Sequence, residues 1–415
     1  MKWSALRAYK QDNHKLFRFF HCYSPKMQRA HNIIVGSLHF ISPLLTTPGL
    51  YFTIRNEEKL WGHNDDKGIF YQQSLKIEND WKRLEIGTEM TSFQTYDWSL
   101  LLLKDIKEKL LRSIFWKPVF VCHLNSGGEV DMIAPLVVQS KSLNLRFYSM
   151  MSGICILGEK SYSDYLNFIY NKWSDEAADE IFSFIHENYG GIELRLNNVP
   201  ENSSLAGYVT NHFELINRDG ETAVFVDNPV DADEYYKLLS KNTRQNIRTA
   251  YNRLAKNNFE CEITMCDTIP DKTTEKVMHD IHNDRFIKKN GLDGKFSIKK
   301  FMWTCAHKNN ETRHNCVFTA LKTLSSSWLL LIRINGEVAG YLCGLKDKDT
   351  YYVMQNSFSE KFREFSPGFL ACYNLVTRFA GNNEIKCIDF TRGTEDYKYK
   401  LNGTEKHLCN FTFNI

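Results

Sequence analysis

The sequence contains no closely spaced cysteine pair. Its 415 residues include eleven cysteines, an odd number, and none forms a C-x-x-C pair. The closest two, Cys261 and Cys266, lack the clustered spacing of a zinc site. The pattern excludes a disulfide-stapled secreted domain and indicates reduced, mostly buried thiols in a cytoplasmic protein.

A long apolar run is also missing. The most apolar window, residues 33–52, is interrupted by His39, Pro43 and Pro48, which makes it a poor spanning helix. Residues 1–20 are basic but lack the apolar core of a secretory signal. We therefore expect no transmembrane segment.

Several signatures of catalysis and cofactor binding are absent as well. Neither GxxxxGK[ST] nor GxGxxG occurs, and there is no GxSxG nucleophile elbow. His279 and His282 have no third ligand at a suitable spacing, so we predict no metal site. The formal net charge of +3 is small and gives no reason to expect DNA as a partner.

What the sequence does contain is an internal repeat of strand, turn, helix and strand patterns. Asn335-Gly336 lies between two apolar runs, which is a signal for a hairpin with a type I′ turn. The repeated patterns are hairpins at 119–138 and 328–345, helices at 174–188 and 369–380, and strands at 192–196 and 388–392. We interpret them as duplication of one α/β unit.

The length and this repeat predict two domains. We place the first at residues 75–226 and the second at 231–415, and treat 1–72 as an extension of unknown role. Between the repeats, residues 231–257 have the apolar period of one long helix.

Arg244 and Arg248 are four residues apart on this predicted helix and share a face. Guanidinium groups in that arrangement suit a phosphate or carboxylate, so the pair is a candidate anion clamp. An ordinary solvated helix face is the alternative.

The segment FSPGFL, residues 365–370, is typical of a helix start. Pro367 follows Ser366 at the first helical position, and Gly368 lets a ligand approach the backbone. A helix start offers free N–H groups and a positive dipole end, which suit a pyrophosphate. An ordinary helix cap is again the alternative.

A strand ending in IDFTR, residues 388–392, is followed by a glycine turn and then by DYKYK, residues 396–400. Side chains at the carboxyl end of a strand in an α/β fold often form the functional site. This crowding of polar and aromatic groups is therefore a candidate active site.

Five segments in this order resemble one family. They are FQTYDW (93–98), YSDYLNF (162–168), LSKNTRQNIRTAYNRL (239–254), FSPGFL (365–370) and IDFTRGTEDYKYKL (388–401). The chain from about residue 75 onward resembles the CelD/BcsL-like branch of the GNAT acyltransferase superfamily, which is related in architecture to the FemABX peptidyltransferases.

The resemblance implies an α/β fold of two tandem GNAT-like units, each with a mixed, largely antiparallel sheet flanked by helices. It implies that the first unit is degenerate and that the second holds acetyl-CoA or another acyl-CoA in a gap between two splayed strands. The cofactor-binding residues would be Arg363, Phe365, Ser366, Gly368 and Phe369. The usual phosphate loop of the superfamily, [RQ]xxGx[GA], is replaced here by a Ser-Pro-Gly form.

The resemblance also implies roles for the segment after the strand. Asp389 and Tyr397 would support proton transfer, and Lys398 would stabilise negative charge or hold the acceptor. The substrate-binding residues would be Arg244, Arg248, Asp164, Tyr165 and Arg392.

The expected activity is direct transfer of an acyl group to an amine of a sugar or cell-envelope precursor, which links the protein to polysaccharide biosynthesis by analogy alone. Two alternatives stay open. One is a FemX-like peptidyltransferase with aminoacyl-tRNA as donor, and the other is a non-catalytic GNAT scaffold that regulates polysaccharide synthesis.

Overall fold

The structure, a computed structural model, describes residues 69–71, 77–108, 116–139, 153–159, 163–289 and 312–415. The chain divides into two compact units, Met1–Leu60 and Trp61–Ile415, and every described residue belongs to the second. The predicted extension at residues 1–72 thus lies outside the described residues, except for one short strand at its end.

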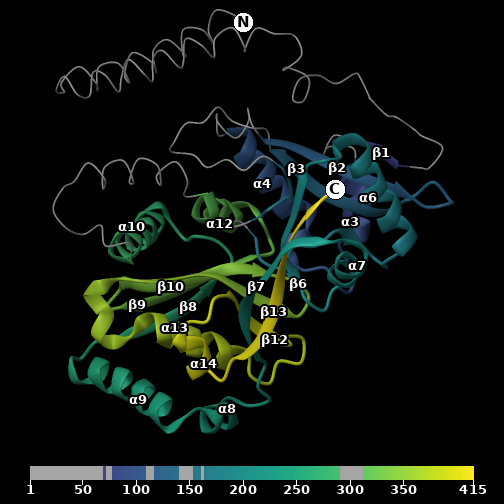
Figure 1. The fold of residues 1–415 in the computed structure, drawn as a ribbon. Helices are drawn as coiled ribbons and strands as arrows, with labels where there is room; N and C mark the ends of the chain where they lie inside the picture. The colour runs from purple at the N-terminus through teal and green to yellow at the C-terminus, as the bar shows by residue number, and fades with distance from the viewer. Residues whose placement is uncertain (1–68, 72–76, 109–115, 140–152, 160–162, 290–311) are drawn as a thin grey trace, which may run out of the picture. The chain divides into compact units, whose positions relative to one another are not determined.

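The helices and strands below keep the labels of Figure 1. The helices are α3 (Glu78–Leu84), η2 (Ser92–Gln94), α4 (Tyr96–Glu108), α6 (Asp175–Tyr189), α7 (Ser204–His212), α8 (Ala232–Leu238), α9 (Lys241–Lys256), α10 (Lys272–Lys289), α12 (Thr312–Thr323), η3 (Glu360–Phe365), α13 (Pro367–Phe379) and α14 (Asp396–Lys400). The strands are β1 (Ile69–Tyr71), β2 (Trp116–Leu124), β3 (Val130–Gln139), β4 (Gly153–Ile156), β5 (Ile169–Tyr170), β6 (Glu193–Pro200), β7 (Leu215–Asp227), β8 (Cys261–Cys266), β9 (Ser327–Ile334), β10 (Glu337–Lys346), β11 (Thr350–Phe358), β12 (Cys387–Arg392) and β13 (Thr404–Asn414).

The described strands form one mixed sheet. Its order is β1-β2-β3-β4-β6-β13-β7-β12-β11-β10-β9-β8, and β5 pairs with β3 beside this path. Among these strands the β4–β6 and β11–β12 pairs are parallel, and the other pairs are antiparallel. We call residues 69–212 the first half and residues 215–415 the second half.

Each half contains the repeat that the sequence predicts. A hairpin (β2–β3 or β9–β10) is followed by a strand, a helix and a second strand parallel to the one before the helix. At the β9–β10 turn, Asn335 and Gly336 have φ angles of 50° and 76°. Positive φ at both central residues is what a type I′ turn requires, so this prediction is confirmed.

Strand β13 joins the two halves. It follows β12 and α14 in the chain but pairs with β6 of the first half on one side and with β7 on the other. Strand β7 in turn pairs with β12 of the second half. The sheet is therefore continuous, and the predicted domain limits at 75–226 and 231–415 stay a prediction.

Alternate residues of the second-half strands face two separate cores. Leu330 and Leu342 pack with α13, whereas Leu329 and Tyr341 pack with α10 and α12. This follows from the alternation of side chains along a strand. Figure 1 shows α13, α8 and α9 on one side of β9–β10, and α10 and α12 on the other.

The prediction of one long helix over 231–257 is wrong. Leu239 is extended (ψ 146°), and the chain continues as the separate helices α8 and α9. Ser240 accepts a hydrogen bond from the Thr243 backbone N–H at 3.1 Å, so it acts as the N-cap of α9. A good capping residue inside an apolar period starts a second helix here.

Candidate active site

Strands β11 and β12 pair only at their starts. Thr350, Tyr351 and Tyr352 pair with residues 387–389, and both strands then run on without pairing to each other. Thr391, with φ of 56°, breaks the regular path of β12, and its hydroxyl donates to the Val353 carbonyl at 3.1 Å. Regular pairing between the strands therefore ends after Tyr352 and Asp389, and the Thr391 hydroxyl makes a contact between them beyond that point.

Helix α13 begins beside the end of β11. Its N-cap, Ser366, is left-handed (φ 50°, ψ 48°), makes no side-chain capping bond, and is exposed. A Cβ added at Gly368 would lie 2.9 Å from Phe358 Cδ1 and 3.0 Å from Asn356 Oδ1, so only glycine fits without displacing them. Pro367 and Gly368 are buried, so the exposed Ser366 is the part of this helix start that a ligand can reach.

The other predicted cofactor residues differ in exposure. Arg363 is exposed and pairs with Glu360 at 3.3 Å. Phe365 is buried and packs against Phe259 with the two rings tilted and their centroids 5.5 Å apart, so it supports the loop from inside the core. Phe369 is half-buried beside that core.

The corresponding helix of the first half, α6, has the opposite electrostatic character. Ser174 caps it by accepting from the Ala177 N–H at 3.2 Å, and Asp175 and Glu176 occupy its first turn. In α13 no acidic residue occupies the first turn. The carboxylates at the start of α6 already offset the positive end of its dipole and repel an anionic ligand. The start of α13 has no such carboxylates, so its dipole attracts an anionic ligand.

In the first half, a charged network links the ends of the two parallel strands, β4 and β6. Arg195 on β6 is buried and pairs with Glu159 at 3.1 Å and with Glu193 at 3.0 Å. It also donates to Gln139 on β3 at 2.8 Å. The network thus connects β6 to β3 and to Glu159, which follows β4 in the described chain.

On the α13 side of β11 lies a polar group that the sequence analysis missed. Asn356 donates to Cys372 Sγ at 3.2 Å, and Arg285 of α10 donates to the Asn356 carbonyl. Among the described residues, Asn356 Oδ1 is buried and has no hydrogen-bond partner. Burial raises the pKa of the nearby Tyr397 phenol, and a hydrogen bond with Asn356 opposes that rise only in part.

Asp389 points away from this group, to the other face of the sheet. Its neighbours Ile388 and Phe390 belong to the core under α13, whereas the Asp389 carboxylate meets Tyr165 of the first half. Both carboxylate oxygens lie 2.8 Å from the Tyr165 hydroxyl. The side chain is fully buried.

Two further donors reach the same carboxylate. The Thr391 backbone N–H donates to it at 2.7 Å, and Lys406 Nζ of β13 pairs with it at 2.7 Å. Burial acts to lower the pKa of Lys406, but the Asp389 carboxylate outweighs burial and the pKa rises. Lys406 is therefore a cation at neutral pH.

Two predicted substrate-binding residues bind each other. Arg392 forms an ion pair with the fully buried Asp164, and it also pairs with Glu221 at 3.2 Å and bonds to Asn198 at 3.0 Å. Burial acts to lower the pKa of Arg392, but the Asp164 carboxylate outweighs it and the pKa rises. Together with the Tyr165–Asp389 contact, this pair anchors the 163–168 loop of the first half to the end of β12.

Lys398 is occupied by backbone carbonyls. Its buried ammonium group donates to the carbonyls of Thr391, Arg392 and Gly393 at 3.0, 2.9 and 2.9 Å. Burial lowers the pKa of Lys398, and the Glu395 carboxylate at 3.0 Å opposes that shift. This geometry holds the turn after β12.

The structure does not bring the two arginines of α9 together as a clamp. Arg244 donates to the carbonyls of Lys237 at 2.7 Å and Leu239 at 2.8 Å, which caps the end of α8. Arg248 is exposed and bonds to Gln245 on its own helix at 3.2 Å.

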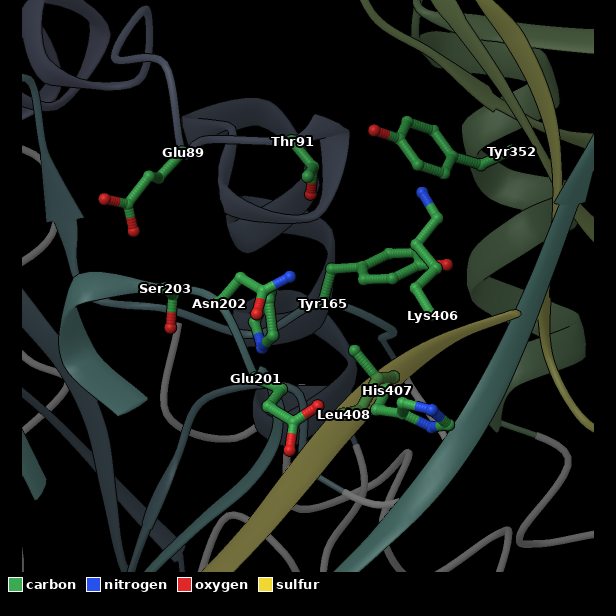
Figure 2. A pocket seen from close by; sticks show the side chains of 11 residues that line it. Glu89, Thr91, Tyr165, Glu201, Asn202, Ser203, Tyr352, Lys406, His407 and Leu408 are labelled. Atoms are coloured by element: carbon green, nitrogen blue, oxygen red, sulfur yellow. The ribbon is translucent and has the colours of Figure 1, made fainter. Parts of the chain in front are cut away.

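A cavity of about 240 Å³ lies beside the Asp389 cluster. The first half contributes Glu89, Thr91, Tyr165 and residues 200–203, and the second half contributes Tyr352 and residues 406–408. Figure 2 shows the Lys406 ammonium group between the rings of Tyr352 and Tyr165. No signal in the sequence pointed to Lys406, Tyr352 or this cavity.

Part of the second half is similar in sequence to a known protein family. Residues 241–399 match the family described as acetyltransferase (GNAT) domain, and these residues include η3, α13 and the end of β12. No curated protein sequence matches the chain.

Two solved structures share the fold. The crystal structure of FemX has a TM-score of 0.53 and 11% identity, covering 84% of this chain and 97% of that one. A conserved protein of unknown function from Bacteroides thetaiotaomicron has a TM-score of 0.50 and 10% identity, covering 82% of this chain and 98% of that one.

Residues 241–399 of the second half are thus similar to a GNAT acetyltransferase domain, and the chain shares the fold of FemX. The predicted fold class, mixed α/β with a largely antiparallel sheet flanked by helices, is confirmed. The assignment to the CelD/BcsL-like branch stays a prediction. None of the helices in the described ranges combines the length and apolar character needed to cross a bilayer. The described side chains also include no group of three His, Cys, Asp or Glu able to hold a metal ion.

Proposed function

We propose that the protein is an acyl-CoA-dependent N-acyltransferase of the GNAT type. It transfers an acetyl or other acyl group directly to an amine of a sugar or cell-envelope precursor. The observation that carries the donor site is the difference between α13 and α6. The helix start in the second half is uncapped by side chains and free of acidic residues, whereas that in the first half is capped and acidic.

Direct transfer requires two proton transfers, one from the amine and one to the leaving thiolate. The amine nitrogen attacks the thioester carbon and loses a proton, and the carbon–sulfur bond breaks to release a thiolate that takes a proton. Tyr397 is suited to supply that second proton, because a phenol is protonated at neutral pH, and burial moves the pKa of this one further above its ordinary value. It lies beside Asn356, beyond the point where β11 and β12 stop pairing.

Asp389 and Lys398 have other roles in this proposal. The Asp389 carboxylate is fully buried and already has three donors, so we assign it the positioning of Tyr165 and Lys406. Lys398 positions the turn that carries Tyr397, since its N–H groups are directed at carbonyl oxygens.

A FemX-like aminoacyl-tRNA donor is the second candidate. The FemX fold over 84% of this chain favours it, although a likeness at 11% identity concerns the fold alone. Titration of the full chain with CoA and with aminoacyl-tRNA, each at two salt concentrations, separates the two donors. CoA binding without turnover of any acceptor would favour the non-catalytic scaffold.

The donor site is tested by placing a carboxylate at the start of α13. Ser366→Asp puts a negative charge where the pyrophosphate is proposed to bind, and aspartate tolerates a left-handed N-cap. We expect CoA to bind about tenfold more weakly by calorimetry, from lost dipole attraction and added repulsion. Ser366→Asn is the neutral control of equal size, and Ser174→Asn is the matched control on α6.

Gly368→Ala supplies a steric version of the same test. Its Cβ would meet Phe358 and Asn356, whereas a Cβ at Gly207 in α7 meets open space, which makes Gly207→Ala the control. Unchanged CoA affinity in both Ser366→Asp and Gly368→Ala would place the donor elsewhere.

A further inference from the structure

The cavity between the two halves opens on the face of the sheet opposite α13. Tyr352 lines it, and Asp389 is buried behind the lining residues Tyr165 and Lys406, whereas Ile388 and Phe390 belong to the core under α13. A donor bound at the start of α13 would lie on one face of the sheet. A ligand in the cavity therefore approaches the point where β11 and β12 stop pairing from the opposite face. Tyr352 and Asp389 are the last residue pair before that point.

Lys406 presents a fixed positive charge to this cavity. Its side chain is 36% exposed, whereas its partner Asp389 is 0% exposed, so a ligand meets the ammonium end of the ion pair. An ammonium group carries three N–H donors, and one carboxylate does not use them all. The ammonium nitrogen lies over the rings of Tyr165 and Phe225, at 5.1 and 4.6 Å from their centroids, which fixes its position.

Two carboxylates line the cavity: Glu201 is exposed and lies 4.0 Å from Arg218, whereas Glu89 is already satisfied. Glu89 accepts hydrogen bonds from the Tyr170 hydroxyl and from the backbone and hydroxyl of Ser204, at 2.6, 2.8 and 2.6 Å. The start of α7 thus neutralises Glu89. Its charge opposes an anionic ligand much less than a free carboxylate would.

The size of the cavity limits what it holds. Its volume of about 240 Å³ is below the range of roughly 300–1,000 Å³ that encloses a drug-sized ligand. It accommodates one sugar ring or a short acidic chain. Tyr165 and Tyr352 line it with aromatic surface next to the cation.

We propose that this cavity is the acceptor subsite, and that Lys406 binds an oxyanion of the acceptor, either a carboxylate or a phosphate. The proposal rests on the proposed function, because it supplies the acceptor of the same transfer. Tyr165 comes from the first half, so the first half completes the acceptor site of the second.

The test compares three amino sugars as ligands of the full-length protein. Glucosamine is neutral apart from its amine, glucosamine 6-phosphate adds a phosphate, and muramic acid adds a carboxylate. We expect at least one acidic sugar to bind about 10- to 100-fold more tightly than glucosamine by calorimetry, as one charge-assisted contact provides. The two acidic sugars distinguish the phosphate from the carboxylate.

Two variants locate the binding. Lys406→Met keeps the length of the stem and should abolish the preference for the acidic sugar, whereas Lys406→Arg should retain most of it. Because Lys406→Met leaves Asp389 buried without its cation, Asn202→Trp provides an independent variant. Asn202 is exposed at the cavity, and a tryptophan there should block all three sugars.

Lys386→Met is the matched control, since Lys386 pairs with Asp349 at 2.5 Å, just before β12 and β11, and neither residue lines the cavity. Equal binding of the three sugars, no binding of any, or unchanged binding in Lys406→Met and Asn202→Trp overturns the subsite. CoA binding is measured on the same samples. If the acidic sugar binds and CoA does not, the proposed function is wrong but the anion-binding subsite is supported. If CoA binds and the acidic sugar does not, only the subsite is wrong.

Discussion

Tyr165 places its hydroxyl 2.8 Å from both carboxylate oxygens of Asp389, which lies 224 residues later in the chain. Burial, and then the Asp389 charge, raise the pKa of Tyr165 well above its ordinary value, so the hydroxyl stays a donor. Tyr165 adopts a φ of 53°, a conformation that costs a non-glycine residue free energy. The first half thus maintains a strained loop residue to support a strand of the second half.

Removing this hydroxyl should destabilise the fold. Tyr165→Phe leaves the ring in place and deletes one hydrogen bond to a buried carboxylate, and we expect it to lower the free energy of unfolding by about 1.5–3 kcal/mol. Denaturant unfolding measures the change. Tyr399→Phe is the control, because its hydroxyl bonds to Glu405 at 2.6 Å on the exposed surface. An equal loss of unfolding free energy in the two variants would show that the buried Tyr165–Asp389 hydrogen bond stabilises the fold no more than the exposed one.

Tyr397→Phe tests the chemistry separately from the fold. If the phenol protonates the leaving thiolate, kcat should fall by about 10²–10⁴ while CoA affinity is retained. Steady-state kinetics with an accepted acceptor, together with CoA calorimetry, measure both quantities. A wild-type kcat would exclude Tyr397 as a proton donor, and Tyr399→Phe again reports on the neighbouring surface.

Lys398→Met distinguishes a structural from a catalytic lysine. The substitution leaves buried carbonyls of Thr391, Arg392 and Gly393 without their donor, so we expect a loss of about 2–4 kcal/mol in unfolding free energy. Lys400 is exposed, so Lys400→Met should leave the unfolding free energy almost unchanged. A Lys398→Met protein with wild-type stability and a much lower kcat would instead restore the catalytic role that the sequence suggested.

His123 makes stability depend on pH. Its hydrogen bond to Asp131 at 2.5 Å raises the pKa of the imidazole, burial opposes this, and Glu180 at 3.6 Å and Glu176 add to the rise. A raised pKa means that the folded state binds the proton more tightly than the unfolded chain. The stabilisation is complete below the unfolded pKa of about 6.5 and disappears as pH rises through the folded value.

Between about pH 5.5 and 8.5, the melting temperature of the wild type should therefore fall with rising pH by more than that of His123→Gln. His186, on the same helix as Glu180, shows no such ion pair among the described residues, so His186→Gln is the control. Parallel pH profiles of the wild type and His123→Gln would contradict this prediction.

Local patterns in the sequence were enough to predict the repeated elements. The Asn335-Gly336 turn, the Pro367 helix start and the apolar strands around them depend on the φ angles and burial of a few neighbouring residues, and the structure has them where expected. The same locality explains an error. Ser240 lies within an apolar period of 3.6 residues, but its capping bond to Thr243 starts a new helix.

Only the tertiary structure decided which polar side chains meet. The sequence marks Asp164, Tyr165, Asp389 and Arg392 as unusual, but the pairing of Asp164 with Arg392 and of Tyr165 with Asp389 depends on how the two halves pack. Lys406 carries no signal at all, because it is one lysine in a strand whose place between β6 and β7 is set by pairing across the whole chain. Such contacts arise from the register of distant strands, which a local pattern of residues does not encode.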